Sequence, residues 1–480
     1  MPDRPNILLI QADQWRGDCL SADGHPVVYT PFLDRLAADG ARFTRAYSAT
    51  PVCIPARVAL HTGLAPQSHG RVAYRDGVPW EYPLTLAGEF ARHGYQTRAI
   101  GKLHTFPERQ RLGFEQVELH DGYLHASRDR RAGDLAANDD YLAWLRRETG
   151  RADADFCAHG LNCNAVAARP WDQDERLHPT NWAVTRALAF LAERDHRRPF
   201  FLYVSFRCPH PPYDPPAWAF DQYLRMDLPV PPVGDWAEDF AEFDQSWHPE
   251  AFRARYRPDV ALRARAGYYG HLTHLDQQIN RLLETLAEWR LDGATAVCFT
   301  SDHGEMLGDH HLYRKGLGYE GSARVPLLLR APGVPPLTVS DAVAEQRDIM
   351  PTLLACAGLP VPAGLDGHSL LAQARGAAGG VREQLHGELT MLGQSCQWLT
   401  DGREKYLWFS RAGREQLFDL RTDPHECRDL ARVPASTARL AWWRTRLAEE
   451  LAGRAEGFAQ DGRLHPGCPP REQISLPCSN

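Results

Sequence analysis

The chain has 480 residues, of which 43% are hydrophobic and 24% charged, with a formal net charge of −7. These values are typical of a globular protein, and the length predicts one large domain with a smaller partner. The acidic balance argues against nucleic-acid binding. The absence of a secretory pattern and of any apolar run near ~18 residues argues against a membrane protein and favours a cytoplasmic one.

Strands and helices alternate over the first hundred residues. A short apolar run predicts a buried strand at 6–12, and further strands are predicted at 42–48 and 96–100. Thr30 as N-cap and Pro31 at the first position predict a helix that stops before Gly40. A second helix is predicted at 84–93, before Gly94. This recurrence predicts an α/β sheet.

The middle of the chain contains a segment of weak periodicity, from about 105 to 180, that is rich in Arg, Asp, His and Gly. It predicts long excursions above the sheet, where substrate specificity often resides. Beyond it the pattern resumes, with strands expected at 199–206, 295–300 and 325–330 and helices at 181–193, 260–289 and 347–356.

The pattern of hydrophobic residues changes beyond about residue 385. Loose alternation over 397–409 and a short run at 416–420 predict a small antiparallel sheet. A final helix is expected at 435–453, followed by an extended tail that could reach a neighbouring subunit in a homo-oligomer. We therefore predict a catalytic domain at 1–385 and a C-terminal subdomain at 386–480.

Two strand ends carry side chains that suit a metal ion. Asp13 and Gln14 follow the first strand, and Asp302 and His303 follow the strand at 295–300. Ligands gather at the carboxyl ends of strands in open α/β sheets. Carboxylate and amide oxygens with one imidazole can hold a divalent cation if the two strands are neighbours. The alternative is that each Asp only caps the following element.

The eleven cysteines are an odd number and scattered, which predicts reduced thiols rather than a disulfide framework. One of them, Cys53, begins a Cys-x-Pro-x-Arg motif that ends at Arg57. A helix is predicted to begin near Pro55. Cys53 would then lie at a helix N-terminus, where backbone N–H groups favour an anion.

The segment from Cys53 to Gly63 resembles the signature of sulfatases, with Ala56 where Ser is usual. Further similar segments occur in the family's order: 6–13, 101–104, 209–211, 301–311, Lys315, 324–327 and 417–424. The chain thus resembles the sulfatases of the alkaline phosphatase superfamily. The resemblance implies that superfamily's fold, a mixed, mainly parallel sheet flanked by helices, with a smaller antiparallel sheet.

The resemblance also implies a mechanism. Cys53 would be oxidised to formylglycine by a formylglycine-generating enzyme. One hydroxyl of the hydrated aldehyde would attack sulfur, and the other would lose its proton as sulfate leaves. A divalent metal ion, Ca²⁺ or Mn²⁺, would be held by Asp13, Gln14, Asp302 and His303 together with residue 53.

Basic residues take the remaining roles that the resemblance implies. Arg57 would hold the diol and balance charge. Lys102 and Lys315 would clamp the sulfuryl oxygens. His104 would assist proton removal from the diol, and His210 would protonate or stabilise the leaving oxygen.

The substrate expected from this pattern is a small sulfate monoester, such as an aryl sulfate. The runs at 13–16 and 308–311 also resemble phosphonate monoester hydrolases and phosphodiesterases, which leaves a phosphonate or phosphate ester as the alternative. A second alternative is a non-catalytic module that binds an anion or a metal. Gln14, where many sulfatases have Asp, and His303 weaken the case for Ca²⁺ and leave room for Mn²⁺.

Overall fold

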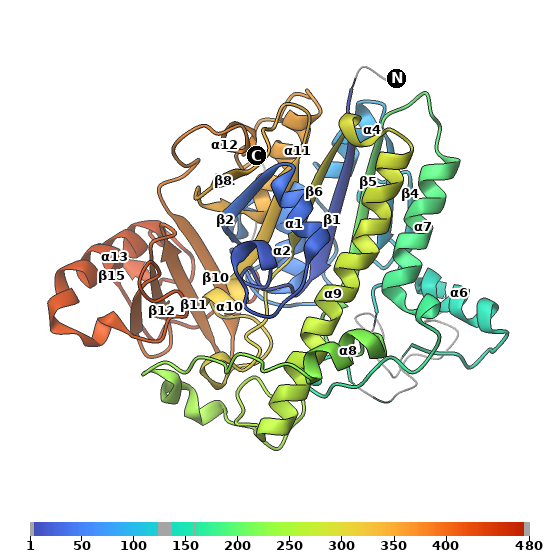
Figure 1. Ribbon diagram of the computed structural model, residues 1–480. Helices are drawn as coiled ribbons and strands as arrows, with labels where there is room; N and C mark the ends of the chain where they lie inside the picture. The colour runs from blue at the N-terminus through green and yellow to red at the C-terminus, as the bar shows by residue number, and fades with distance from the viewer. Residues whose placement is uncertain (1–3, 123–136, 157–159, 161, 475–480) are drawn as a thin grey trace.

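A computed structural model describes residues 4–122, 137–156, 160 and 162–474 of the chain. Two β-sheets organise it (Figure 1). The larger sheet has the order β4-β3-β5-β1-β6-β7-β2-β8, and β9 also pairs with β2. Its strands are β1 (Asn6–Asp13), β2 (Ala41–Tyr47), β3 (Gln96–Gly101), β4 (Gln116–Leu119), β5 (Phe200–Pro209), β6 (Thr295–Ser301), β7 (Arg324–Arg330), β8 (Thr338–Ser340) and β9 (Ala344–Glu345).

Strand β1 is the centre of this sheet and is buried along its whole length. It runs parallel to β5 on one side and to β6 on the other, whereas β7 is antiparallel to both β6 and β2. Ile7 and Leu9 pack into the apolar cluster of one face, and Leu8 and Ile10 into that of the other. Because both faces are covered, the strand reads as a continuous apolar run rather than an alternating one.

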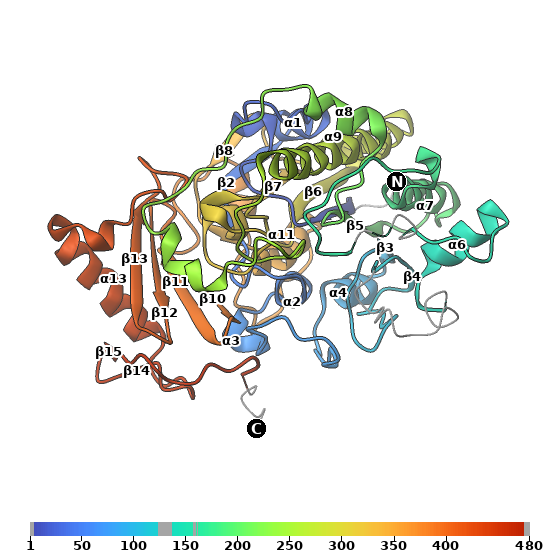
Figure 2. The same ribbon diagram turned by 90° about the horizontal axis from the view of Figure 1, so that it is seen from below.

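Helices cover both faces of the large sheet (Figure 2). One layer contains α1 (Pro31–Ala38), α6 (Asp140–Thr149), α7 (Pro179–Glu193), α8 (Ala217–Leu224) and the long α9 (Pro258–Glu288). The other contains α2 (Cys53–Thr62), α4 (Leu86–Arg92), α11 (Ile349–Cys356) and α12 (Leu371–Ala374). Two single-turn helices, α3 (Pro66–His69) and α10 (Glu320–Ala323), lie in the connections.

The smaller sheet is a four-stranded antiparallel meander of β10 (Leu385–Met391), β11 (Gln394–Thr400), β12 (Glu404–Phe409) and β13 (Arg414–Asp419). Trp443 and Leu447 of α13 (Thr437–Glu450) pack on it. The short pair β14 (Ala459–Gln460) and β15 (Arg463–Leu464) follows. Trp398 shares a further apolar cluster with Tyr47 of the large sheet. The division after residue 385 stays a prediction.

The predicted fold class is confirmed, and the differences are local. The segment 105–180 contains β4 and α6, which its weak periodicity did not reveal. The stretch 397–409 is two strands that turn at Gly402, and β10 precedes them. Thr30 does precede α1, but its hydroxyl contacts Ser21 and Asp34 rather than capping a backbone N–H.

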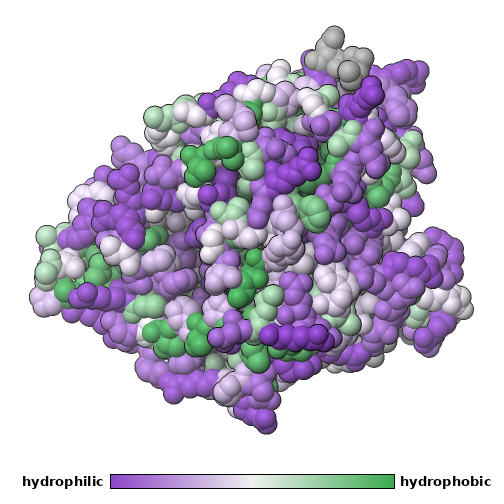
Figure 3. Space-filling view, in the orientation of Figure 1, coloured by the Kyte–Doolittle hydropathy of each residue, from purple (hydrophilic) through white to green (hydrophobic). Residues whose placement is uncertain are grey.

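The surface seen in Figure 3 is mainly hydrophilic, with hydrophobic residues in small separate groups. Among the described residues, no helix combines the length and apolar character that crossing a bilayer requires. The cysteines in this part of the chain are all free thiols.

Candidate active site

The two predicted strand ends meet. Because β1 and β6 are adjacent and parallel, Asp13 and Asp302 come to the same edge of the sheet. The N-terminus of α2 brings Cys53 to this edge. The ligating atoms of Asp13, Cys53, Asp302 and His303 all lie within 4.8 Å of one another, and all four residues are buried. The structure therefore brings these four predicted residues together in one buried group.

The orientation of His303 suits metal ligation. Its Nδ1 lies 2.9 Å from the Gly304 carbonyl oxygen, to which it donates, so Nε2 presents its lone pair to the cluster. Nε2 is 3.2 Å from Cys53 Sγ and 3.8 Å from Asp13 Oδ1. Burial lowers the pKa of His303, which keeps the ring neutral. One neutral imidazole, two carboxylates and residue 53 together fit a divalent cation.

Two buried cations balance the two carboxylates. Arg57 donates from Nε to Asp302 Oδ2 at 3.1 Å and from Nη2 to Asp13 Oδ2 at 3.2 Å. The Lys102 ammonium also pairs with Asp13. Burial opposes the ionisation of Asp13, but the charges of Lys102 and Arg57 outweigh it and hold its pKa well below the usual range. The Asp13 carboxylate is therefore ready to bind a cation at neutral pH.

Arg57 also anchors α2 to the sheet. Its Nη1 donates to Gln11 Oε1, the Lys102 carbonyl oxygen, Tyr203 Oη and Ser205 Oγ, at 2.9–3.3 Å. The sequence reasoning missed Gln11, Tyr203 and Ser205, since each reads as an ordinary position of a buried strand. These contacts place Arg57 against the carboxylates, and its predicted contact with the diol stays a prediction.

Gln14 connects the cluster to two further residues. Its backbone N–H donates to Asp302 Oδ1 at 3.0 Å, its side-chain oxygen accepts from Lys315 at 2.5 Å, and its amide nitrogen donates to Glu305. Gln14 adopts a φ of 74°, which turns the chain sharply after β1. Glu305 was not predicted, although it stands only three residues after Asp302. Gln14 therefore lies beside the four-ligand group, and its role as a metal ligand stays a prediction.

A cavity of about 520 Å³ opens in front of Cys53. His210 and Lys315 line it, together with Tyr74, Asn164, Met391 and Glu472. His210 donates from Nδ1 to the Pro211 carbonyl oxygen at 2.9 Å. Burial, assisted by the nearby Lys315, holds the pKa of His210 well below its usual range. The ring is therefore neutral, and its Nε2 carries a lone pair.

His104 is buried beside Tyr74, which lines this cavity. Its backbone N–H donates to Asp121 Oδ1 at 2.9 Å, and its Nε2 lies 3.4 Å from Asp76 Oδ1 and 3.5 Å from Tyr74 Oη. Tyr74 was not predicted, because no motif marks it. His104 thus reaches the cavity through Tyr74, and its predicted action on the diol is untested.

Comparison with known proteins identifies similar chains over nearly the whole length. The family model described as Sulfatase matches residues 5–359, and that of the C-terminal part of N-sulphoglucosamine sulphohydrolase matches residues 308–452. An arylsulfatase of Clostridium perfringens is 43% identical over 475 residues, 97% of this chain and 98% of that protein. A choline-sulfatase of Rhizobium meliloti is 30% identical and matches 90% of this chain and 83% of its own. Among solved structures, a phosphonate monoester hydrolase of Agrobacterium radiobacter superposes with a TM-score of 0.78 at 28% identity, covering 93% of this chain and 95% of that one.

Proposed function

The chain belongs to the sulfatase family of the alkaline phosphatase superfamily and is an arylsulfatase-like hydrolase of sulfate esters, and from this premise we propose that it cleaves an aryl sulfate with a formylglycine made from Cys53. The observation that carries the proposal is the buried group of Asp13, Cys53, Asp302 and His303, of which Cys53 lines the cavity. No observation favours the alternative of a non-catalytic module, since the nucleophile position, the ligands and both lysines are present.

The position of Cys53 supports a modified nucleophile. Its Sγ stands where the oxygens of the hydrated aldehyde would be, at the first residue of α2 and 3.2 Å from His303 Nε2. The helix N-terminus favours the negative charge that an attacking oxygen carries. The maturation partner would be a formylglycine-generating enzyme, and the attack on sulfur would form a covalent sulfate ester at residue 53.

The charge of the site supports an anionic substrate and one divalent ion. Asp13 and Asp302 are balanced by Arg57 and Lys102, so a bound divalent cation would leave the site positive toward a sulfate group. Asp13, Asp302, His303 and residue 53 would hold the ion, with Gln14 beside them. When bound, the ion would polarise the nucleophile and a sulfate oxygen. The two carboxylates and one imidazole accept either Ca²⁺ or Mn²⁺.

The other basic residues are proposed to act around the sulfuryl group. Lys315 lines the cavity and reaches Gln14, so its ammonium can contact a sulfate oxygen. Lys102 keeps Asp13 ionised, and its ammonium would contact the sulfuryl oxygens from the buried side of the site. His104 would assist the loss of the diol proton, with Tyr74 between it and the cavity.

Side-by-side rates test the choice of substrate. We expect the enzyme with modified Cys53 and bound metal to turn over 4-nitrophenyl sulfate faster than a phenylphosphonate monoester or a bis(4-nitrophenyl) phosphate diester. The similarity to a phosphonate monoester hydrolase favours the phosphonate monoester as the alternative substrate. If the sulfate is the poorest of the three, the sulfate assignment is wrong and the phosphonate or diester activity takes its place.

Replacing His210 by glutamine should slow esters with basic leaving groups more than activated ones. An acid that protonates the leaving oxygen contributes about 10²–10⁴-fold. The neutral ring of His210 must first take up a proton, and the anionic substrate would favour this. We expect a large fall in kcat/KM for phenyl sulfate and a small one for 4-nitrophenyl sulfate. Equal losses on both esters would instead assign His210 to positioning.

A further inference from the structure

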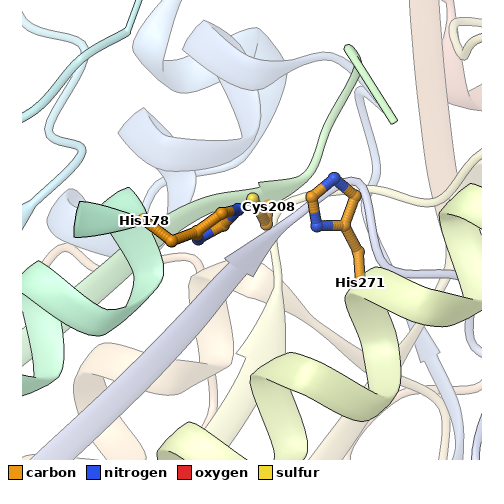
Figure 4. A group of neighbouring side chains, drawn as sticks. All are labelled: His178, Cys208 and His271. Atoms are coloured by element: carbon orange, nitrogen blue, oxygen red, sulfur yellow. The ribbon is translucent and has the colours of Figure 1, made fainter. Parts of the chain in front are cut away.

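A second group of cysteine and histidine side chains lies outside the active site. It consists of Cys208 at the end of β5, His178 directly before α7 and His271 on α9, and their ligating atoms lie within 4.8 Å of one another. The two histidines are 0% exposed and Cys208 is 1% exposed. The rings lie on either side of the cysteine (Figure 4). The mechanism proposed above gives no role to any of the three.

The backbone fixes where the hydrogen of His178 lies. The Thr180 N–H, at the start of α7, donates to His178 Nδ1 at 3.1 Å. Because Nδ1 accepts, the neutral ring carries its hydrogen on Nε2. Among the described residues this Nε2 has no hydrogen-bond partner. Burial also lowers the pKa of His178, so the ring is neutral and points a single N–H toward the group.

The same argument applies to His271. The Asp214 N–H lies 3.0 Å from His271 Nε2, which favours a lone pair there and leaves the hydrogen on Nδ1. Nε2 is also 3.2 Å from the Pro212 carbonyl oxygen and 3.3 Å from Asp214 Oδ1. If Nε2 takes up a second proton, these two oxygens can accept a hydrogen bond from it. The ring can therefore become an imidazolium without losing its Nδ1–H. Nδ1 has no partner within hydrogen-bonding geometry in the described part of the chain.

The sulfur of Cys208 is thus faced by two N–H groups rather than by two lone pairs. A metal ion needs lone pairs, and a metal-bound histidine usually donates its other N–H to an oxygen. His178 is arranged the other way round, because its Nδ1 accepts from the backbone and its Nε2–H is directed toward the sulfur. Two N–H donors instead stabilise a negative sulfur. Burial opposes ionisation of Cys208, but His271 and Arg207 outweigh it and lower its pKa. Burial likewise opposes the charge on His271, but Cys208 and Asp214 raise its pKa to about 9.

We propose that Cys208 is a buried thiolate held by His178 and His271, and that it is a second reactive sulfur of the enzyme, which hydrogen peroxide oxidises to a sulfenic acid. The sulfur attacks one peroxide oxygen, and an S–O bond forms as the O–O bond breaks. Sulfur loses two electrons to the departing oxygen, which takes a proton from the His271 imidazolium and leaves as water. The product is Cys208 sulfenic acid beside a neutral His271.

Cys396 is a matched internal control for this proposal. It is also 1% exposed, but burial raises its pKa to about 12. The full-length enzyme would be treated with hydrogen peroxide, trapped with dimedone and digested, and the labelling of the two cysteine peptides compared by mass spectrometry. The Cys208 peptide should be labelled at least about tenfold faster, because the thiolate is the species that peroxide oxidises. Equal labelling would overturn the proposal, since both thiols are equally buried.

A second measurement needs no access to the sulfur. The ultraviolet thiolate absorbance of the wild type at pH 7 should exceed that of Cys208→Ala by one thiolate, and His271→Gln should lose the same signal. Absence of this difference in both variants would overturn the proposal. So would one equivalent of zinc bound by the wild type and lost in Cys208→Ala, because the sulfur would then be a metal ligand. Neither measurement depends on the proposed sulfatase mechanism.

Discussion

Replacing Cys53 by alanine should abolish sulfate ester hydrolysis. The variant lacks the side chain from which the attacking oxygen is built, and loss of a nucleophile costs at least ~10⁴-fold in kcat. Stability should change by about 1 kcal/mol or less, because the removed sulfur contacts polar groups of the site rather than apolar core. The measurements are kcat/KM with an aryl sulfate and the thermal unfolding midpoint of the same sample.

Three controls separate the nucleophile from its surroundings. Cys396→Ala, at an equally buried position of the smaller sheet, should keep its activity. Cys53→Ser should release one equivalent of alcohol and then stop, because a serine sulfate ester lacks the second hydroxyl that expels sulfate. In the native host, the wild-type peptide that contains residue 53 should be lighter than its cysteine form. Retention of most activity by Cys53→Ala would show that another residue attacks sulfur.

Replacing Asp302 by asparagine should remove the metal ion and the activity together. Asp302 Oδ2 accepts from Arg57 Nε, while Oδ1 accepts from the backbone N–H groups of Gln14 and His303. An asparagine keeps one oxygen for the backbone groups, but its amide N–H groups would face Arg57 and the ion. Metal affinity should fall about 100-fold or more, since changes even outside the ligand shell cost 10–100-fold. The measurements are metal content after dialysis and activity against added Ca²⁺ or Mn²⁺.

Asp276 offers a matched control for Asp302. It is equally buried, but it accepts from the backbone N–H groups of Phe32 and Leu33 at the start of α1. Burial raises its pKa to about 7, so the amide replaces a carboxyl that is about half protonated at neutral pH. Asp276→Asn should keep both the metal and the activity. Full activity of metal-free Asp302→Asn would contradict the metal-ligand role.

The sequence could predict the parts of the site that local rules create. Apolar runs that end in Asp13 and Asp302 identify strands whose carboxyl ends carry ligands, because buried parallel strands read as continuous apolar segments. The Cys-x-Pro-x-Arg motif placed Cys53 at the start of a helix, and α2 begins at that residue. These predictions needed only neighbouring residues in the chain.

Other parts of the site depend on contacts between distant segments. Tyr203 and Ser205 face Arg57 only because β5 lies beside β1, and Glu305 meets Gln14 only because the chain turns after β6. Tyr74 lies in a connection that carries no motif. The elements β4 and α6 were also missed, since β4 is only half-buried and α6 buries a narrow stripe. Short amphipathic elements give a weak signal in a polar segment.

By itself, the sequence determined the α/β class, the strand ends that carry ligands and the cysteine that starts a helix, because periodicity and turn residues act over a few neighbours. Only the tertiary structure decided the balance of charge at Asp13, the neutral state of His210 and the meeting of His178 and His271 at Cys208. Burial removes water from these groups, so their protonation depends on partners that the fold brings from far along the chain.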